Sequence, residues 1–173
     1  RKYGREIAGD DIGYWWSFMP VKKDTEPFPS EGFVIKTRND ASVDLTKPEA
    51  YFYAKYAIAA GADKLTLKAR NFNGSSPTYF GLVAITEDMA VTPVIPTFTP
   101  GEGVENYLGE AVNGQLFKFI NEDGGQGNPE KYATFEYDLS AFDGKNVVLA
   151  LGVVKGEDSG NEDKLCMYSI TLN

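Results

Sequence analysis

Apolar and polar residues alternate along much of this chain with a period of two. Leu65 and Leu67 fall on one side of their segment, and Thr66 and Lys68 fall on the other. A period of two puts successive side chains on opposite faces of a β-strand, so that one face can be buried while the other meets water. We therefore predict a half-buried strand here and a second one, with the same alternation, over residues 132–139.

Ten segments carry a strand pattern, and most are bounded by glycine, proline, asparagine or aspartate. They span residues 14–19, 32–37, 50–58, 64–72, 78–86, 115–120, 132–139, 146–154 and 164–172, with a weaker one at 94–98. Short strands separated by such turn residues are typical of an all-β sandwich. Residues 47–60 are the one segment that could form a helix instead of a strand, because alanine, glutamate and lysine favour helix. The alternation of Tyr51, Tyr53 and Lys55 with apolar neighbours favours a strand there.

The last forty residues read as strand, turn, strand, loop and closing strand. Residues 139–145 predict a single turn in which Leu139 and Phe142 tuck beneath the sheet, with Asp143-Gly144 as the reversal. The following segment, 146–154, is apolar on both faces, which suits a strand that is covered on both sides. The predicted fold class is therefore an all-β, antiparallel two-sheet β-sandwich.

Two connections are long for a compact sandwich, residues 20–31 and residues 87–114. The second has 28 residues and contains Pro93, Pro96 and Pro100. A loop of that size is usually functional or covers another part of the protein. We expect one domain over residues 1–173. Because the chain begins Arg-Lys-Tyr without an initiator methionine, we expect it to be excised from a longer or processed chain.

The net charge limits the classes of partner that the chain is expected to bind. The chain has 17 basic and 25 acidic residues, for a formal net charge of −8. Nucleic acids and anionic membrane surfaces need clustered lysine and arginine, so a neutral ligand is expected instead. With no histidine, Ser-His-Asp, Cys-His and histidine-metal sites are excluded. The chain contains no run of about 18 apolar residues, so no membrane-spanning helix is predicted.

Aromatic residues near polar groups offer candidate sugar contacts, because a pyranose stacks on an aromatic ring while its hydroxyls bond polar side chains. Trp15 and Trp16 are adjacent and cannot both face the core. Residues 70–79 join two strands through a polar loop, and Asn106-Tyr107 lies in the long connection. The alternatives are a tryptophan packed beneath residues 20–31 and an ordinary hairpin turn. We predict sugar contacts from Trp16, Arg70, Asn71, Asn73, Tyr79 and Tyr107.

A polar surface is a further candidate. If the strands at 64–72 and 132–139 share a sheet, Lys68, Arg70, Tyr132 and Glu136 line its outer face. That face is either a solvated surface with cross-strand ion pairs or a polar, aromatic-edged platform for a ligand.

Paired carboxylates would suit a glycosidase. Glu136 and Asp138 lie on one face of one strand, about 7 Å apart along it, within the range that such enzymes use. With 25 acidic residues such pairs arise easily, so no catalytic residue is expected.

A metal would need oxygen ligands, which the acidic or glycine-rich segments 9–11, 123–128 and 157–163 could supply. None has the spacing of an EF-hand loop, so solvated turns are expected.

The closing segments FEYDLSAFDGKNVVLALGVV and DKLCMYSITL, preceded by YFYAKYAIAAGADKLTLKARNFNG, resemble the galactose-binding-like jelly rolls over residues 50–172. These serve as carbohydrate-binding and accessory modules of secreted or surface proteins of polysaccharide-degrading bacteria, notably gut Bacteroidetes. The resemblance implies a jelly roll whose first and last strands pair. It also implies a secreted, cell-surface or periplasmic location.

Many members of that family carry a structural calcium, held by an early acidic residue and an aspartate of the closing strand. Here Tyr168 stands where that aspartate is expected, while Glu6, Asp10 and Asp11 could supply early ligands. No cofactor is therefore predicted.

The resulting expectation is a non-catalytic carbohydrate-binding or accessory module. Its partners would be a neutral oligo- or polysaccharide, or other domains of its parent protein. The alternatives are a structural or adhesive surface domain and a small glycoside hydrolase or lyase.

Overall fold

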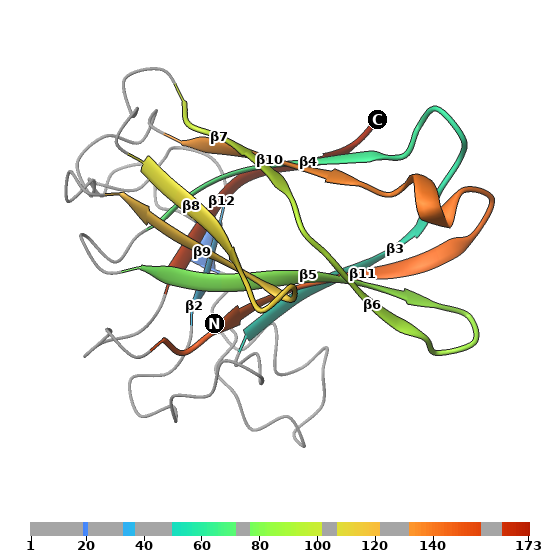
Figure 1. The fold of residues 1–173 in the computed structure, drawn as a ribbon, viewed down its shortest axis with the longest axis horizontal. Helices are drawn as coiled ribbons and strands as arrows, with labels where there is room; N and C mark the ends of the chain where they lie inside the picture. The colour runs from blue at the N-terminus through green and yellow to red at the C-terminus, as the bar shows by residue number, and fades with distance from the viewer. Residues whose placement is uncertain are drawn as a thin grey trace.

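The computed structural model of the chain describes residues 19–20, 33–36, 50–71, 77–101, 107–121, 132–156 and 164–173. In these ranges the protein consists of two antiparallel β-sheets packed face to face, which Figure 1 shows as an upper and a lower layer. The one helical element there is a 3-10 turn, η2 (Ser140–Phe142). No helix in the described ranges is long and apolar enough to cross a membrane.

Sheet A has the order β1 (Met19–Pro20), β2 (Phe33–Lys36), β12 (Lys164–Leu172), β4 (Lys64–Asn71), β10 (Ala133–Asp138) and β7 (Thr97–Thr99). Its strands β4, β7 and β10 lie uppermost in Figure 1, and the last strand of the chain, β12, pairs with β2 on one side and with β4 on the other. The pairing of β4 with β10 confirms that these two strands share a sheet.

The lower layer, sheet B, has the order β3 (Ala50–Ala57), β11 (Asn146–Val154), β5 (Thr78–Thr86), β9 (Leu116–Asn121) and β8 (Tyr107–Val112). The strand β6 (Val91–Val94) also pairs with β5. Because β9 pairs with β5 at residues 78–80 and β6 pairs with it at 82–85, both follow one edge of β5 in succession. The other edge of β5 pairs with β11.

Phenylalanine rings fill the space between the sheets. Phe135 of β10 lies 5.2 Å from Phe80 of β5 and 5.2 Å from Phe119 of β9, in both cases edge to face. Phe98 of β7 joins the same group, 5.4 Å from Phe135. Edge-to-face rings gain electrostatic attraction beyond their buried area. This cluster is built from four strands that are far apart in the sequence, and it joins sheet A to sheet B.

Most predicted strands are confirmed, three of them with the predicted bounds: β5, β11 and β12. The ambiguous segment at residues 47–60 contains the strand β3, which pairs with β11 over eight residues. The predicted turn at residues 139–145 is confirmed as well. Leu139 and Phe142 are buried beneath it, and Gly144 has a φ of 75°, a conformation that favours glycine.

The long loop predicted over residues 87–114 is wrong, because this segment contains β6, β7 and β8. Its prolines suggested a region without strands. Pro93 nevertheless lies inside β6, opposite Val83 of β5. Proline lacks an amide hydrogen and is tolerated on a strand that pairs on one side only. The proline pattern therefore marked a strand at the edge of a sheet.

Candidate functional site

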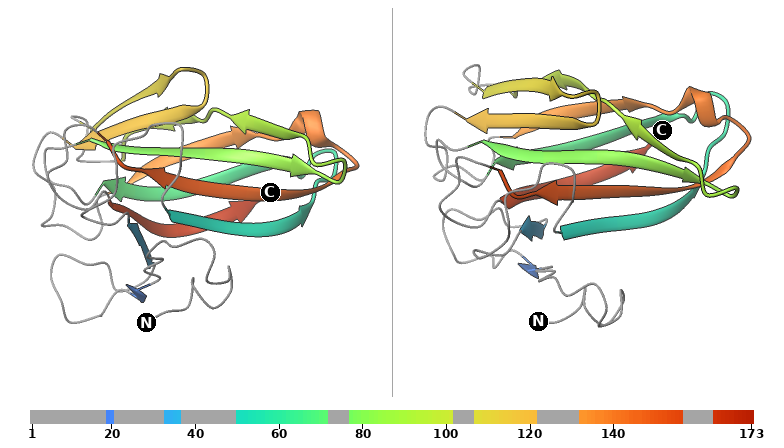
Figure 2. Two further views of the ribbon diagram at one scale, coloured as in Figure 1. Left: turned by 90° about the horizontal axis from the view of Figure 1, so that it is seen from below. Right: turned by 60° about the horizontal axis from the view of Figure 1, so that its bottom comes forward.

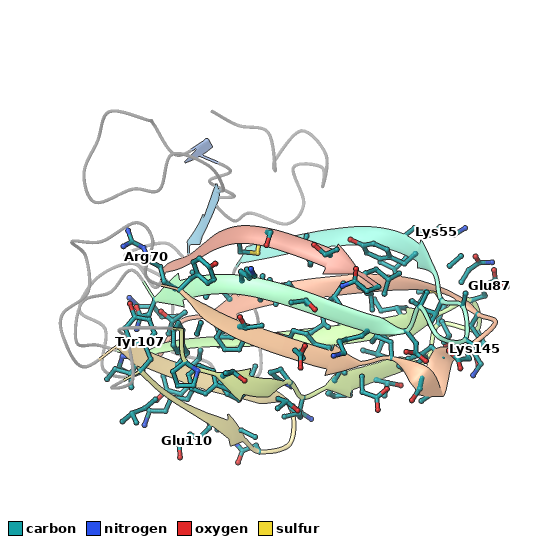
Figure 3. The ribbon with its side chains drawn as sticks, turned by 90° about the horizontal axis from the view of Figure 1, so that it is seen from above. Lys55, Arg70, Glu87, Tyr107, Glu110 and Lys145 are labelled. Carbon is teal, nitrogen blue, oxygen red and sulfur yellow. The ribbon has the colours of Figure 1, made fainter. Side chains whose placement is uncertain are left out.

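Four of the six predicted sugar-contacting residues lie at one end of the sandwich. Arg70 and Asn71 end β4, Tyr79 is near the start of β5, and Tyr107 begins β8. Figure 3 labels Arg70 and Tyr107 at this end. All four side chains are buried, with exposed fractions from 0% to 8%.

Five other candidate residues, Trp16, Asn73, Glu6, Asp10 and Asp11, lie outside the described residues.

The side chain of Asn71 connects the two sheets. Its Nδ2 donates a hydrogen bond of 3.1 Å to the carbonyl oxygen of Phe119 in sheet B. Its Oδ1 accepts one of 3.1 Å from Oγ1 of Thr78, also in sheet B. A buried amide is costly unless it is hydrogen-bonded, and here both of its ends are engaged. Asn71 thus has a structural role in this arrangement.

The two tyrosines of this end pack against protein. The ring of Tyr107 meets Phe119 edge to face, 5.6 Å between centroids. Tyr79 packs with Leu116 and Val154, and a methyl group at Gly156 would lie only 2.6 Å from its ring. Stacking on a sugar needs an exposed ring. A sugar could therefore reach these rings only after the surrounding structure moved.

The outer face of sheet A presents hydroxyl and charged side chains in two rows across four strands. The first row is Ser169, Lys68, Thr134 and Thr99, and the second is Thr171, Thr66, Glu136 and Thr97. All eight are exposed or partly exposed. Residues that alternate with them, such as Leu67 and Phe135, are fully buried in the core. We call these eight residues, together with Tyr132, the polar face.

Lys68 and Tyr132 form one edge of the polar face. The ammonium nitrogen of Lys68 lies 5.1 Å from the centroid of the Tyr132 ring and 3.4 Å from its hydroxyl oxygen. An ammonium group over an aromatic ring is attracted by the electrons of the ring face. Among the described residues, no acidic side chain forms an ion pair with Lys68. Its ammonium protons can therefore serve a ligand.

The expected grouping of Lys68, Tyr132 and Glu136 is found, but Arg70 differs. It belongs to the same strand as Lys68 and is fully buried rather than part of the exposed face. Strand alternation fixes the direction of a side chain and not what lies over it.

The carboxylates Glu136 and Asp138 both have structural partners. Glu136 forms a 3.0 Å ion pair with Lys64, and Asp138 accepts a 2.9 Å hydrogen bond from the backbone N–H of Ser140. Hydrogen bonds from Ser140 hold the pKa of Asp138 below its usual value. A general acid of a glycosidase needs a raised pKa. These contacts favour a structural role for the pair.

Within the described ranges, no group of three or more histidine, cysteine, aspartate or glutamate side chains is placed to hold a metal ion. No model of a known protein family matches the chain, and none of the curated proteins is significantly similar to it.

The sequence indicated part of the polar face but not its extent. The hydroxyl groups of Thr97 and Thr99 join it only because β7 pairs with β10. The alternation Thr97-Phe98-Thr99 was the available signal, and the flanking Pro96 and Pro100 obscured it.

Proposed function

We propose that this protein is a jelly-roll domain that binds carbohydrate without catalysis, as an accessory module of an extracellular or surface glycan-utilisation protein. The polar face is the proposed binding surface. The observation that carries this proposal is the combination of rows of hydroxyl groups with Lys68 and Tyr132 on one face of sheet A. The opposite face of that sheet packs against the core.

The strand order supports a jelly roll. Setting aside β1, β7, β8 and β9, eight strands remain, and they pair as first with last, second with seventh, third with sixth and fourth with fifth. The pairs are β2 with β12, β3 with β11, β4 with β10 and β5 with β6. This nested pairing is what results when one long hairpin rolls up into two sheets, the arrangement of an eight-stranded jelly roll.

The chemistry of the polar face suits a neutral sugar. Threonine and serine hydroxyls both donate and accept hydrogen bonds, and the ammonium of Lys68 donates. The charge of Glu136 is balanced by Lys64, so the face has no strong excess of one sign. The partly exposed Tyr132 adds an aromatic ring beside these groups.

Binding to a panel of neutral polysaccharides by affinity electrophoresis tests the proposal. Lys68→Ala and Tyr132→Ala should each weaken retention about tenfold, because each removes one direct contact worth about 1.4 kcal/mol. Lys118→Ala is the matched control, since Lys118 lies in sheet B and pairs with Glu110 at 3.4 Å.

Retention unchanged in both polar-face variants would place binding elsewhere. Absence of any retention at millimolar sugar would contradict sugar binding itself.

A structural or adhesive role is the second candidate. It is favoured by an observation on the other side of the sandwich, where the outer face of sheet B is apolar.

A further inference from the structure

Apart from Asn146 at the start of β11, the outward positions of three neighbouring strands in sheet B carry aliphatic side chains, glycine, proline or a tyrosine. They are Tyr79, Gly81, Val83 and Ile85 of β5, Val148, Ala150, Gly152 and Val154 of β11, and Val91 and Pro93 of β6. The alternate positions of these strands, such as Leu82 and Leu149, point into the core and are buried. Figure 2 (left) looks at this sheet from its outer side.

Half of this apolar surface is covered by the protein itself. Leu116 and Val112 of the β8–β9 hairpin pack on Tyr79 and Val154. The hairpin also passes close to Gly81, where a methyl group would lie 2.9 Å from the carbonyl oxygen of Gln115. The β8–β9 hairpin thus covers one end of the outer face of sheet B.

The other half stays open to solvent in the described structure. Val83, Ile85, Val148 and Ala150 are partly exposed, and Pro93 is exposed. Val91 is 59% exposed, and Met89 at the rim is 75% exposed. We call these residues, without Met89, the open apolar face. Contiguous apolar surface of this kind on a soluble protein usually marks an interaction site.

Charged groups lie on two borders of the open apolar face. Lys55 of β3 is exposed and stands in register with Val148 on one side. Glu87 and Asp88, also exposed, follow the end of β5 in the turn that leads to β6, at one end of the face, where Oε1 of Glu87 accepts a 3.1 Å hydrogen bond from Asn146 of β11. Figure 3 shows Lys55 and Glu87 at the same end of the sandwich. The residue row Lys55–Val148–Ile85–Val91 therefore begins with a basic side chain on β3, and the acidic turn lies just past this row, where β5 connects to β6.

This arrangement allows the face to pack against a copy of itself. A two-fold axis parallel to the strands and between β11 and β5 would bring β3 of one copy opposite β6 of the other. Val148 would then face Ile85 of the second copy, and Lys55 would face Val91, next to the acidic turn of that copy. Two-fold interfaces of this kind use the same patch on both subunits.

We propose that the open apolar face is where a second copy of this chain packs, sheet against sheet, with Lys55 beside the Glu87–Asp88 turn of the other copy. Sheets packed in this way lie about 10 Å apart, with their strands nearly aligned. The face spans three strands spaced about 4.8 Å apart and two outward rows, which is less than the roughly 800 Å² per partner of stable complexes. The dimer is therefore weak and reversible.

Sedimentation velocity of the full chain tests the proposal from about 10 µM to about 1 mM protein, in about 0.15 M salt to screen the net charge. The weight-average sedimentation coefficient of the wild type should rise toward that of a dimer over this range. Ile85→Lys should stay monomeric. Thr66→Lys adds the same charge on the polar face and should associate like the wild type.

A charge swap checks the orientation without disturbing apolar packing. Lys55→Glu should weaken association about tenfold, and the double variant Lys55→Glu with Glu87→Lys should restore it. A wild type that is monomeric throughout would overturn the proposal. So would a Thr66→Lys variant as defective as Ile85→Lys, or a double swap that restores nothing.

Discussion

The outer faces of the two sheets lie on one shared core but differ in chemistry. On sheet A, outward positions such as Thr66, Lys68 and Thr134 are polar and alternate with buried apolar residues. On sheet B, outward positions such as Val83 and Val148 are apolar as well. A strand that is apolar on both faces needs cover on both faces. Sheet A therefore presents a polar outer face to solvent, whereas part of the apolar outer face of sheet B is exposed.

The difference also separates the two proposed interactions in space. A glycan on the polar face and a second copy on the open apolar face would occupy opposite sides of the sandwich. The buried bonds of Asn71 join the two sheets behind these faces. Changes at the joining bonds should therefore affect both faces together, whereas changes on either face should affect it alone.

The largest effect on stability is expected from the bonds that join the sheets. Asn71→Ala removes the acceptor of the Thr78 hydroxyl and a donor to the Phe119 carbonyl, both in a buried site. The free energy of unfolding should fall by about 2 kcal/mol. Urea denaturation measures it.

Asn146→Ala is the matched control, because Asn146 bonds Glu87 on the surface. It should change the free energy of unfolding by less than about 0.5 kcal/mol. Equal losses in the two variants would mean that the contact between the sheets does not depend on Asn71.

A smaller effect should distinguish the outer faces from each other. Val83→Thr puts a hydroxyl among the apolar neighbours of sheet B and should lower the free energy of unfolding by about 1 kcal/mol. Thr134→Val makes the reverse change on sheet A and should alter it by less than about 0.5 kcal/mol. Urea unfolding at low protein concentration measures both without a contribution from association. If both substitutions cost the same, the two faces do not differ energetically.

The sequence predicted local structure well and spatial neighbours poorly. The bounds of β5 and β11 were correct because runs of apolar residues end there at turn residues. The weaker strand predicted at 94–98 covers the end of β6 and part of β7 but not the break between them, and β8 was missed. Proline on an edge strand cannot be told from proline in a loop by composition. Local patterns of apolar and polar residues do not determine which strands pair.

The same limit explains why the predicted sugar site includes residues that are buried in the structure. Asn71 looked like a surface residue because it precedes a polar loop, yet it bonds across to a strand 48 residues away. Tyr107 looked exposed because its strand was not predicted. The polar face was anticipated from the alternation of Lys68 and Glu136, since alternation alone decides which residues share a side.

The smallest expected effects concern two carboxyls in and beside the connection from sheet A to sheet B. The pKa of Asp138, at the end of β10, is lowered by hydrogen bonds from Ser140. The pKa of Asp143, just after η2, is raised by partial desolvation and by the nearby charges of Asp63 and Asp138. Asp138 therefore adds stability above its ordinary pKa, and this is lost as pH falls through the lowered value. Asp143 does the opposite, because its folded form holds a proton that the unfolded chain has released. Its contribution is lost as pH rises through the raised value.

Asp63→Asn should separate these two contributions. It removes a neighbouring charge and a hydrogen-bond partner from Asp143 but leaves the desolvation, so the pKa of Asp143 should move down only part of the way to its ordinary value. The pKa of Asp138 should not change, since its shift comes from Ser140. Titration of the two carboxyl carbons by NMR measures both values in one sample. An unchanged Asp143 would rule out Asp63 as a cause of its shift. A moving Asp138 would mean that the turn titrates as one unit, and the carboxyl of sheet A would then be coupled to the start of sheet B.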